Sequence, residues 1–245
     1  MNLIGLGLVG FSAILLLAFT VIKRKTPPKW RTIPALAKLS RAVDLSVEDG
    51  TRLFVSLGRA SLLTARGGAP LAGLGLLRRI TERASLSDRP PVAVAGEASV
   101  ALLAQDTLQA GYRAMGASDL YQPTSGRLSG MTPFSAAAGA MPIFRDENVS
   151  AGMLVGDFGV EAALLADVAE RENTFLLGAS SDISSQAALF ASAQEPLIGE
   201  ELFATGAYFD AGASHAASLT VQDILRWLII FALLAGAVLK LIGLI

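Results

Sequence analysis

The feature that most constrains this chain is the run from Leu3 to Ile22, which holds twenty residues without a charged side chain. At about 1.5 Å per residue, a helix of that length covers the roughly 30 Å hydrocarbon core of a bilayer. A basic cluster that begins at Lys23 follows the run, whereas a cleaved signal peptide carries its basic residues before the apolar segment. The sequence therefore predicts an uncleaved transmembrane helix over residues 1–22.

A second apolar segment covers residues 222–245. Its uncharged part, Trp227 to Leu239, is only thirteen residues long, so it spans a bilayer only if Arg226 and Lys240 extend toward opposite interfaces. Its side chains are apolar on every face, which favours lipid over the half-exposed surface of a soluble domain. We predict a second transmembrane helix here; the alternative is a buried helix of the soluble part.

Basic residues between the two apolar segments predict the orientation. Residues 23–41 contain seven Lys or Arg and no acid, and basic flanks are retained on the cytoplasmic side of a membrane. We therefore expect a cytoplasmic central domain over residues 42–221, with both termini outside. Residues 23–41 are predicted to be a basic juxtamembrane linker, kept extended by Pro34. This linker either meets anionic lipid or serves only as an orientation signal.

Composition excludes several kinds of chemistry. There is no cysteine, and His215 is the single histidine, so thiolate sites and multi-histidine zinc sites are impossible. Residues 42–221 contain eleven Arg, no Lys and twenty acids, a net charge of −9. Such a domain is expected to avoid nucleic acid, because that binding rests on phosphate neutralisation. No cofactor and no metal site are predicted.

The central region has the pattern of an α/β fold. Apolar strands this short and continuous are usually covered on both faces, as in a parallel sheet between helices. Asp49-Gly50 separates two alternating segments and suits a tight hairpin turn. We predict an open, largely parallel sheet flanked by helices, preceded by a β-hairpin, with one transmembrane helix at each end. The expected strands are 43–47, 51–57, 92–95, 153–155 and 175–177, and the expected helices are 69–84, 97–115, 160–172 and 183–193.

Residues 120–148 are not assigned to any element. Pro123, Pro133, Pro142 and several Gly and Ser interrupt every periodicity in this stretch.

Three predicted strands end in glycine followed by polar residues. Carboxyl ends of parallel strands share one edge, where ligands bind at the point of strand-order reversal. Helix starts there would favour an anion, whereas the acids would oppose it or recruit a divalent cation. The alternative is that glycine makes a tight turn and Asp or Ser caps the next helix. The predicted ligand-binding residues are Gly96, Glu97, Gly156, Asp157, Gly178, Ser180 and Asp182.

Small residues recur in both apolar segments. Residues 5–10 fit the G-x-G-x-x-G pattern of dinucleotide sites, but that loop functions only between a strand and a helix of a folded domain. In lipid, small residues permit close approach of helices, although they also occur on faces that merely contact lipid. The predicted helix-packing residues are Gly5, Gly10, Ser12, Ala232 and Gly236.

Two segments, Phe144 to Ser150 and Ser192 to Phe203, resemble an uncharacterised bacterial family of two-span membrane proteins known only as a domain of unknown function. The resemblance covers most of the chain, including both spans. It implies no activity and no catalytic residues.

Two classes of function remain. The first is a membrane-anchored interaction or scaffold module that forms a homo-oligomeric assembly in the bilayer, for which a ring is the natural closed form. The second is a domain that binds or transforms an unknown small molecule at the strand ends, through carboxylates such as Glu97 and Asp157 if it is an enzyme. Scarce catalytic groups and attachment at both ends favour the first, non-enzymatic class.

Overall fold

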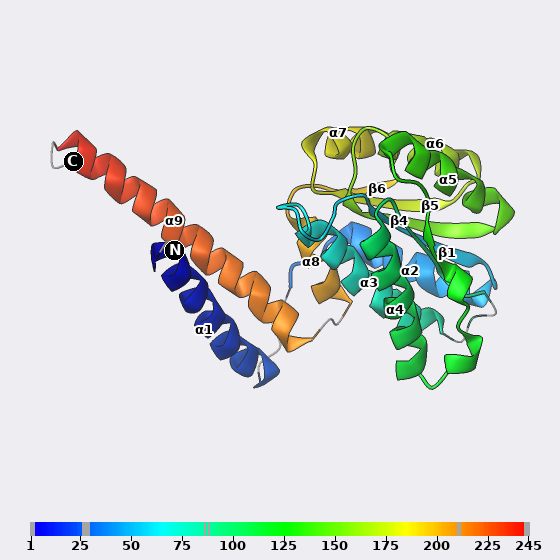
Figure 1. Ribbon diagram of the computed structural model, residues 1–245, viewed down its shortest axis with the longest axis horizontal. Helices are drawn as coiled ribbons and strands as arrows, with labels where there is room; N and C mark the ends of the chain where they lie inside the picture. The colour runs from blue at the N-terminus through cyan, green and yellow to red at the C-terminus, as the bar shows by residue number, and fades with distance from the viewer. Residues whose placement is uncertain (1–2, 26–29, 86, 88, 210–211, 243–245) are drawn as a thin grey trace. The chain divides into compact units, whose positions relative to one another are not determined.

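The computed structural model describes residues 3–25, 30–85, 87, 89–209 and 212–242. The chain divides into two compact units (Figure 1). The larger unit, Arg31–Phe209, is an α/β domain, and the smaller contains the helices α1 (Leu3–Lys25) and α9 (Ala213–Leu241).

The α/β unit is built on one sheet of six parallel strands in the order β3-β2-β1-β4-β5-β6. From β1 in the middle, the chain adds β2 and β3 on one side, then returns to add β4, β5 and β6 on the other. The predicted open parallel sheet is confirmed. The strands are β1 (Arg52–Gly58), β2 (Val92–Ala95), β3 (Gly126–Leu128), β4 (Val149–Asp157), β5 (Phe175–Ser180) and β6 (Glu195–Leu197).

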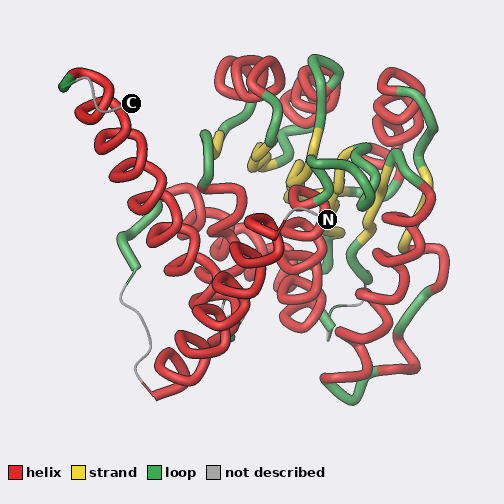
Figure 2. Tube along the Cα trace, turned by 60° about the vertical axis from the view of Figure 1, so that its left-hand side comes forward, coloured by secondary structure: helices red, strands yellow, loops and turns green. Residues whose placement is uncertain are grey.

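Helices cover both faces of the sheet, as Figures 1 and 2 show. Alternate residues of β1 point to opposite cores: Leu53 and Val55 belong to one, Phe54 to the other. The first core lies under α2, α3, α4 and α8, and the second under α5, α6 and α7. These helices are α2 (Pro34–Glu48), α3 (Gly68–Ala84), α4 (Ala98–Ala114), α5 (Pro133–Asp146), α6 (Ala162–Arg171), α7 (Ile183–Ser192) and α8 (Glu201–Tyr208).

The helices predicted over 69–84, 97–115, 160–172 and 183–193 are confirmed as α3, α4, α6 and α7. The predicted strand 92–95 lies in the same sheet as 153–155, but β1 separates the two, whereas 153–155 and 175–177 are neighbours.

The predicted β-hairpin is wrong. Residues 34–48 form helix α2, and β1 pairs in parallel with β2 and β4. Leu36, Leu39 and Val43 are buried at helical spacing, so the segment is held to the sheet as a helix. The Asp49-Gly50 pair does form a turn, with Gly50 at φ +63°, but this turn ends the helix.

The extended linker expected over residues 23–41 also differs from the structure. Pro34 does not prevent a helix here, because it occupies the first turn of α2, where a missing N–H costs nothing. Residues 26–29 of the linker lie outside the described residues.

The unassigned stretch, residues 120–148, contains the short helix η2 (Pro123–Ser125), strand β3 and helix α5. Another short helix, η1 (Ser118–Leu120), precedes it. Thr132 and Ser135 form a capping box, and Pro133 occupies the first turn of α5. The prolines that obscured the periodicity therefore mark helix starts, except Pro142 inside α5.

In the smaller unit, α1 and α9 lie side by side and antiparallel (Figure 1). Both are long and apolar enough to cross a membrane, over Gly5–Lys25 and Ala213–Leu241. The second helix begins at Ala213, upstream of the predicted boundary at residue 222. Residues 243–245 of the predicted span lie outside the described residues.

Not all of the small residues predicted to pack helices together lie where α1 contacts α9. Half-buried positions of α1 include Ser12, Leu15 and Phe19, three or four residues apart, as on a face that packs against another helix. A Cβ added at Gly10 or Gly236 meets no described atom within 4 Å. If these two glycines pack against a helix, that helix belongs to another copy or another protein, and this role stays a prediction.

Candidate functional site

The strand order places a cavity at the carboxyl edge of the sheet. The order reverses between β1 and β4, so the segments that follow these strands lead to opposite faces and leave a crevice between them. This switch-point cavity has about 290 Å³ of empty space, including the part open to solvent. It is lined by Ser56, Gly58, Arg59, Gly96, Ser129, Pro133, Ala136, Ala137, Phe158, Glu161 and Leu165.

An ion pair forms the polar side of the cavity. Arg59 follows β1 and donates from Nε to Glu161 Oε1 at 3.2 Å, and the Gly159 amide donates to the same oxygen at 2.9 Å. The Glu161 side chain is only 7% exposed and stands at the start of α6, where the helix dipole stabilises negative charge. The guanidinium and carboxylate are thus fixed at the mouth.

Gly58 is required to bring Arg59 to this position. Its φ is +73°, and a Cβ there would lie 2.2 Å from the carbonyl oxygen of Asp157. Only glycine permits this close approach of the end of β1 to β4.

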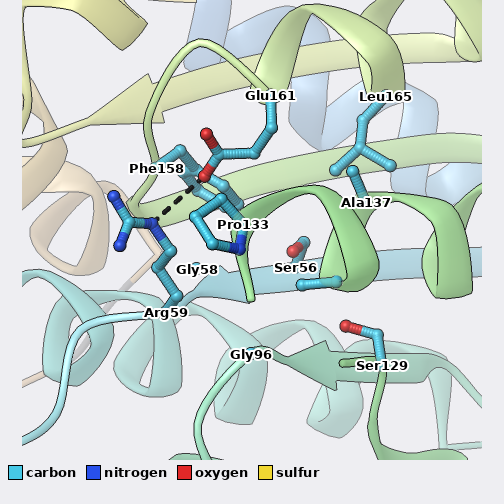
Figure 3. A pocket seen from close by; sticks show the side chains of 11 residues that line it. Ser56, Gly58, Arg59, Gly96, Ser129, Pro133, Ala137, Phe158, Glu161 and Leu165 are labelled. Atoms are coloured by element: carbon cyan, nitrogen blue, oxygen red, sulfur yellow. Dashed lines mark hydrogen bonds and ion pairs between the residues drawn. The ribbon is translucent and has the colours of Figure 1, made fainter. Parts of the chain in front are cut away.

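Apolar groups form the opposite side of the cavity. Figure 3 shows Arg59 and Glu161 on one side, Ala137 and Leu165 on the other, and the hydroxyl of Ser56 between them. Ser56 is 5% exposed and lines the cavity. The cavity therefore has a charged side, an apolar side and a serine side chain between them.

A second polar cluster lies at the ends of β4 and β5. Arg66 Nη1 lies 3.5 Å from Asp157 Oδ1 and 3.2 Å from Asp182 Oδ1, and the Ser181 hydroxyl donates to Asp157 at 2.6 Å. The two acids thus share one arginine. Across the described ranges, no group of three or more Asp, Glu or His is arranged to hold a metal ion.

Asp182 also caps α7. Its carboxylate accepts from the backbone amides of Ser184 and Ser185, and the hydrogen bond from the Ser184 hydroxyl is the main cause that lowers the pKa of Asp182. Ser180 belongs to the same cluster, since its buried hydroxyl accepts from the amide of Phe158 at 3.2 Å.

Of the other predicted ligand-binding residues, Gly156 borders this cluster, because its carbonyl accepts from the Ser181 amide at 3.2 Å. Gly96 lines the switch-point cavity. Glu97 caps α4 by accepting from the Val100 amide at 2.9 Å, and a hydrogen bond from Ser99 lowers its pKa. Gly156 and Gly178 lie within strands, where a Cβ would meet Leu57 O at 2.1 Å or the Leu189 side chain at 2.9 Å. Glu97 therefore caps a helix, as the alternative to ligand binding predicts, and Asp182 does so as one of its roles. Ligand binding by these residues stays a prediction.

The sequence prediction missed Arg59, Glu161, Ser56 and Arg66. Gly58-Arg59 has the same signature as the other strand ends, an apolar strand followed by glycine and a polar residue. The incorrect hairpin removed this strand from the parallel sheet and so concealed the signal.

Large apolar side chains are exposed along the same edge. Five such residues follow β1, β3, β4 and β5, strands that all end at this edge. We call this set of residues the carboxyl-edge rim. A single exposed apolar residue is ordinary, but several at one edge mark an interaction surface. The rim consists of Leu63 (97% exposed), Met131 (83%), Phe134 (62%), Val160 (57%) and Ile183 (83%).

Comparison with known proteins gives a family without an assigned activity. Residues 2–245 match the family described as "Domain of unknown function (DUF6754)". No curated protein and no solved structure matches the chain. Since the match extends over nearly all of its length, the chain belongs to the DUF6754 family.

Proposed function

We propose that this protein is a membrane-anchored interaction module that assembles with other copies of itself through the carboxyl-edge rim. The observation that carries the proposal is the exposure of the rim, above all of Leu63, Met131 and Ile183. Removing apolar surface from water contributes about 25 cal/mol per Å², so a partner that covers these side chains gains binding free energy.

The helices of the smaller unit offer a second apolar surface for association between copies. Gly10, Ile14, Leu17 and Val21 share one face of α1 by their spacing, and all are exposed. This face lies on the opposite side of α1 from Ser12, Leu15 and Phe19. A second copy of the chain covers both surfaces without any other component, which is why we commit to self-assembly.

Membrane insertion of α1 and α9 would restrict the geometry of this assembly. Copies held in one bilayer are related most simply by rotation about its normal, which gives a closed ring or a dimer. The seven basic residues between 23 and 41 favour a cytoplasmic α/β unit and termini outside the cytoplasm.

Polar substitution in the rim tests self-assembly. We expect Leu63→Ser combined with Ile183→Ser to weaken association at least tenfold, because each change removes apolar area from the contact. Native mass spectrometry of the full chain in mild detergent measures the number of copies. The matched control is Leu102→Ser on α4, which replaces a leucine that is 66% exposed but lies outside the rim. Equal copy numbers for both variants, or a monomeric wild type at high concentration, contradict the proposal.

Reporter fusions test the orientation. A reporter active only outside the cytoplasm should give signal when fused after Ile245 and none when inserted at the Asp49-Gly50 turn. The basic flank is the reason for this expectation. The reverse pattern contradicts a cytoplasmic α/β unit.

A further inference from the structure

We infer that the carboxyl-terminal end of α1 binds the headgroups of anionic phospholipids through Lys23, Arg24 and Lys25, a set that we call the basic triplet. This binding rests on the proposed function, because the triplet meets headgroups only if α1 lies in a bilayer. It adds to that function the class of lipid that the chain selects. Three features support it: the lack of counter-charges within the described residues, the position of the triplet on the helix and the apolar surface beside it.

The basic triplet forms no salt bridge within the part of the chain that the structure describes. Counter-charges are not scarce, since the chain contains 21 Asp or Glu and 20 Lys or Arg. Arg31, which follows soon after in the sequence, pairs with Glu201. Lys38 likewise pairs with Glu195. The triplet, by contrast, keeps three positive charges that a bound anion can neutralise.

The position of the triplet on α1 coincides with the level of headgroups. The uncharged run from Leu3 to Ile22 covers about 30 Å as a helix, which is the thickness of the hydrocarbon core. The residues that follow this run therefore lie at the interface when α1 spans a bilayer. Successive residues of a helix are about 100° apart, so the three side chains spread over about 200° of its circumference. They can thus contact headgroups on more than one side of α1.

Exposed apolar side chains cover α1 next to the triplet. Outside the face that we assign to self-assembly, Leu6, Phe11 and Ile22 are 60%, 45% and 51% exposed. Acyl chains cover such side chains in a bilayer, while lysine and arginine extend their charged ends to the interface. An anionic phospholipid matches both parts, because its acyl chains contact apolar surface and its phosphate contacts a cation. A soluble phosphate matches only the charged part.

Basic residues at this position also set the orientation of a membrane protein, and that role needs no bound lipid. The two roles predict the same topology in a membrane. They are separated in detergent, where the protein has no orientation. A headgroup site keeps its preference for anionic lipid in detergent, whereas an orientation signal has no such preference.

Lipid titration of the full chain in mild detergent tests headgroup binding. Phosphatidylglycerol and phosphatidylcholine with the same acyl chains are added separately, and native mass spectrometry counts the lipids bound to each particle. A basic residue near anionic lipid contributes about fivefold in affinity, so phosphatidylglycerol should bind at least tenfold more tightly than phosphatidylcholine. The preference should also fall when ammonium acetate is raised from about 0.05 M to about 0.5 M. Equal affinity for the two lipids overturns the inference.

A soluble anion separates the headgroup from the whole lipid. Glycerol 3-phosphate carries a phosphate without acyl chains, so it should show no saturable binding up to about 10 mM. Saturation by glycerol 3-phosphate at lower concentration would overturn the assignment to lipid.

Substitution of the triplet locates the site. Lys23→Gln combined with Arg24→Gln and Lys25→Gln should remove most of the preference and leave the two lipids within about twofold of each other. If the preference is retained in this variant, the triplet is not the binding site and the assignment is overturned.

The matched control removes the same charge from the α/β unit, at positions that are all exposed. It should keep the preference of the wild type, and an equal loss in the control would overturn a role specific to the triplet. The control combines Arg113→Gln, Arg145→Gln and Arg171→Gln.

Two further readouts separate this inference from the proposed function. The copy number in the same mass spectra reports self-assembly independently of the lipids that are bound. Alkaline extraction of native membranes reports insertion, because only a chain that is not inserted enters the soluble fraction. An inserted, assembled chain without a lipid preference therefore overturns headgroup binding alone, whereas an extracted chain overturns the membrane anchoring and with it the headgroup binding.

Discussion

Replacing Glu147 by alanine should lower the free energy of unfolding of the α/β unit by about 2–3 kcal/mol, because it leaves the partly buried Arg52 without its counter-charge. Glu147 accepts from both Arg52 and Arg127, and its backbone carbonyl accepts from Arg89 at 3.3 Å. The Arg52 side chain is only 15% exposed. These contacts join the start of β1 to β3 and to the end of α5.

Among the residues that the structure describes, Glu147 is the carboxylate that pairs with Arg52. Tyr112 lies close enough to sense the charge of Arg52, but burial raises the pKa of Tyr112 to about 12, so it stays neutral at pH 7. The control is Glu82→Ala, which also removes a glutamate paired with two arginines, Arg78 and Arg79. Arg78 and Arg79 are 54% and 31% exposed, against 15% for Arg52, so the expected loss is below about 1 kcal/mol. Denaturant unfolding followed by circular dichroism measures both, and equal losses would contradict this assignment.

Replacing Gly73 by alanine should cost about 3 kcal/mol, because α3 lies directly against the sheet at that point. A Cβ at Gly73 would lie 2.3 Å from the carbonyl oxygen of Val155 and 2.7 Å from the Leu57 side chain. The backbone of β4 cannot move away without disturbing its pairing with β1 and β5.

Gly75 in the same helix is the matched control. A Cβ there meets nothing within 4 Å, so Gly75→Ala should stabilise the unit by up to about 1 kcal/mol through helix propensity alone. The two substitutions are therefore expected to have opposite signs in the same unfolding measurement. Stabilisation by Gly73→Ala would show that α3 does not pack as closely as described.

The β-α rhythm could be predicted from the sequence because buried strands and amphipathic helices leave different periodicities. That signal was clear for β2, β4 and β5 and for the helices α3, α4, α6 and α7. The strand predicted over 51–57 is confirmed as β1, but the signal failed at residues 34–48, where α2 ends in an Asp-Gly pair that also suits a hairpin. The position of β1 between β2 and β4 has no local signal, because strand order depends on tertiary packing.

Only part of the candidate site could be predicted from the sequence, because tertiary packing decides which strand-end residues lie together. Glycine followed by a polar residue identifies a strand end, but it does not separate a helix cap such as Glu97 from a cavity residue such as Arg59. The contact of Arg66 with Asp157 depends on how the loop after β1 crosses the sheet edge. The rim was equally hidden, since Leu63 and Ile183 resemble core residues until the fold places them at the surface.

Cross-linking through a single introduced cysteine tests self-assembly through the rim most directly. The chain contains no cysteine, so a bismaleimide can join only two copies of a single-cysteine variant. In native membranes, Ile183→Cys in the rim should give a cross-linked dimer, whereas Leu102→Cys, a similarly exposed position outside the rim, should stay monomeric. Equal cross-linking at both positions, or none at Ile183→Cys while its thiol reacts with a monofunctional maleimide, would contradict the proposal.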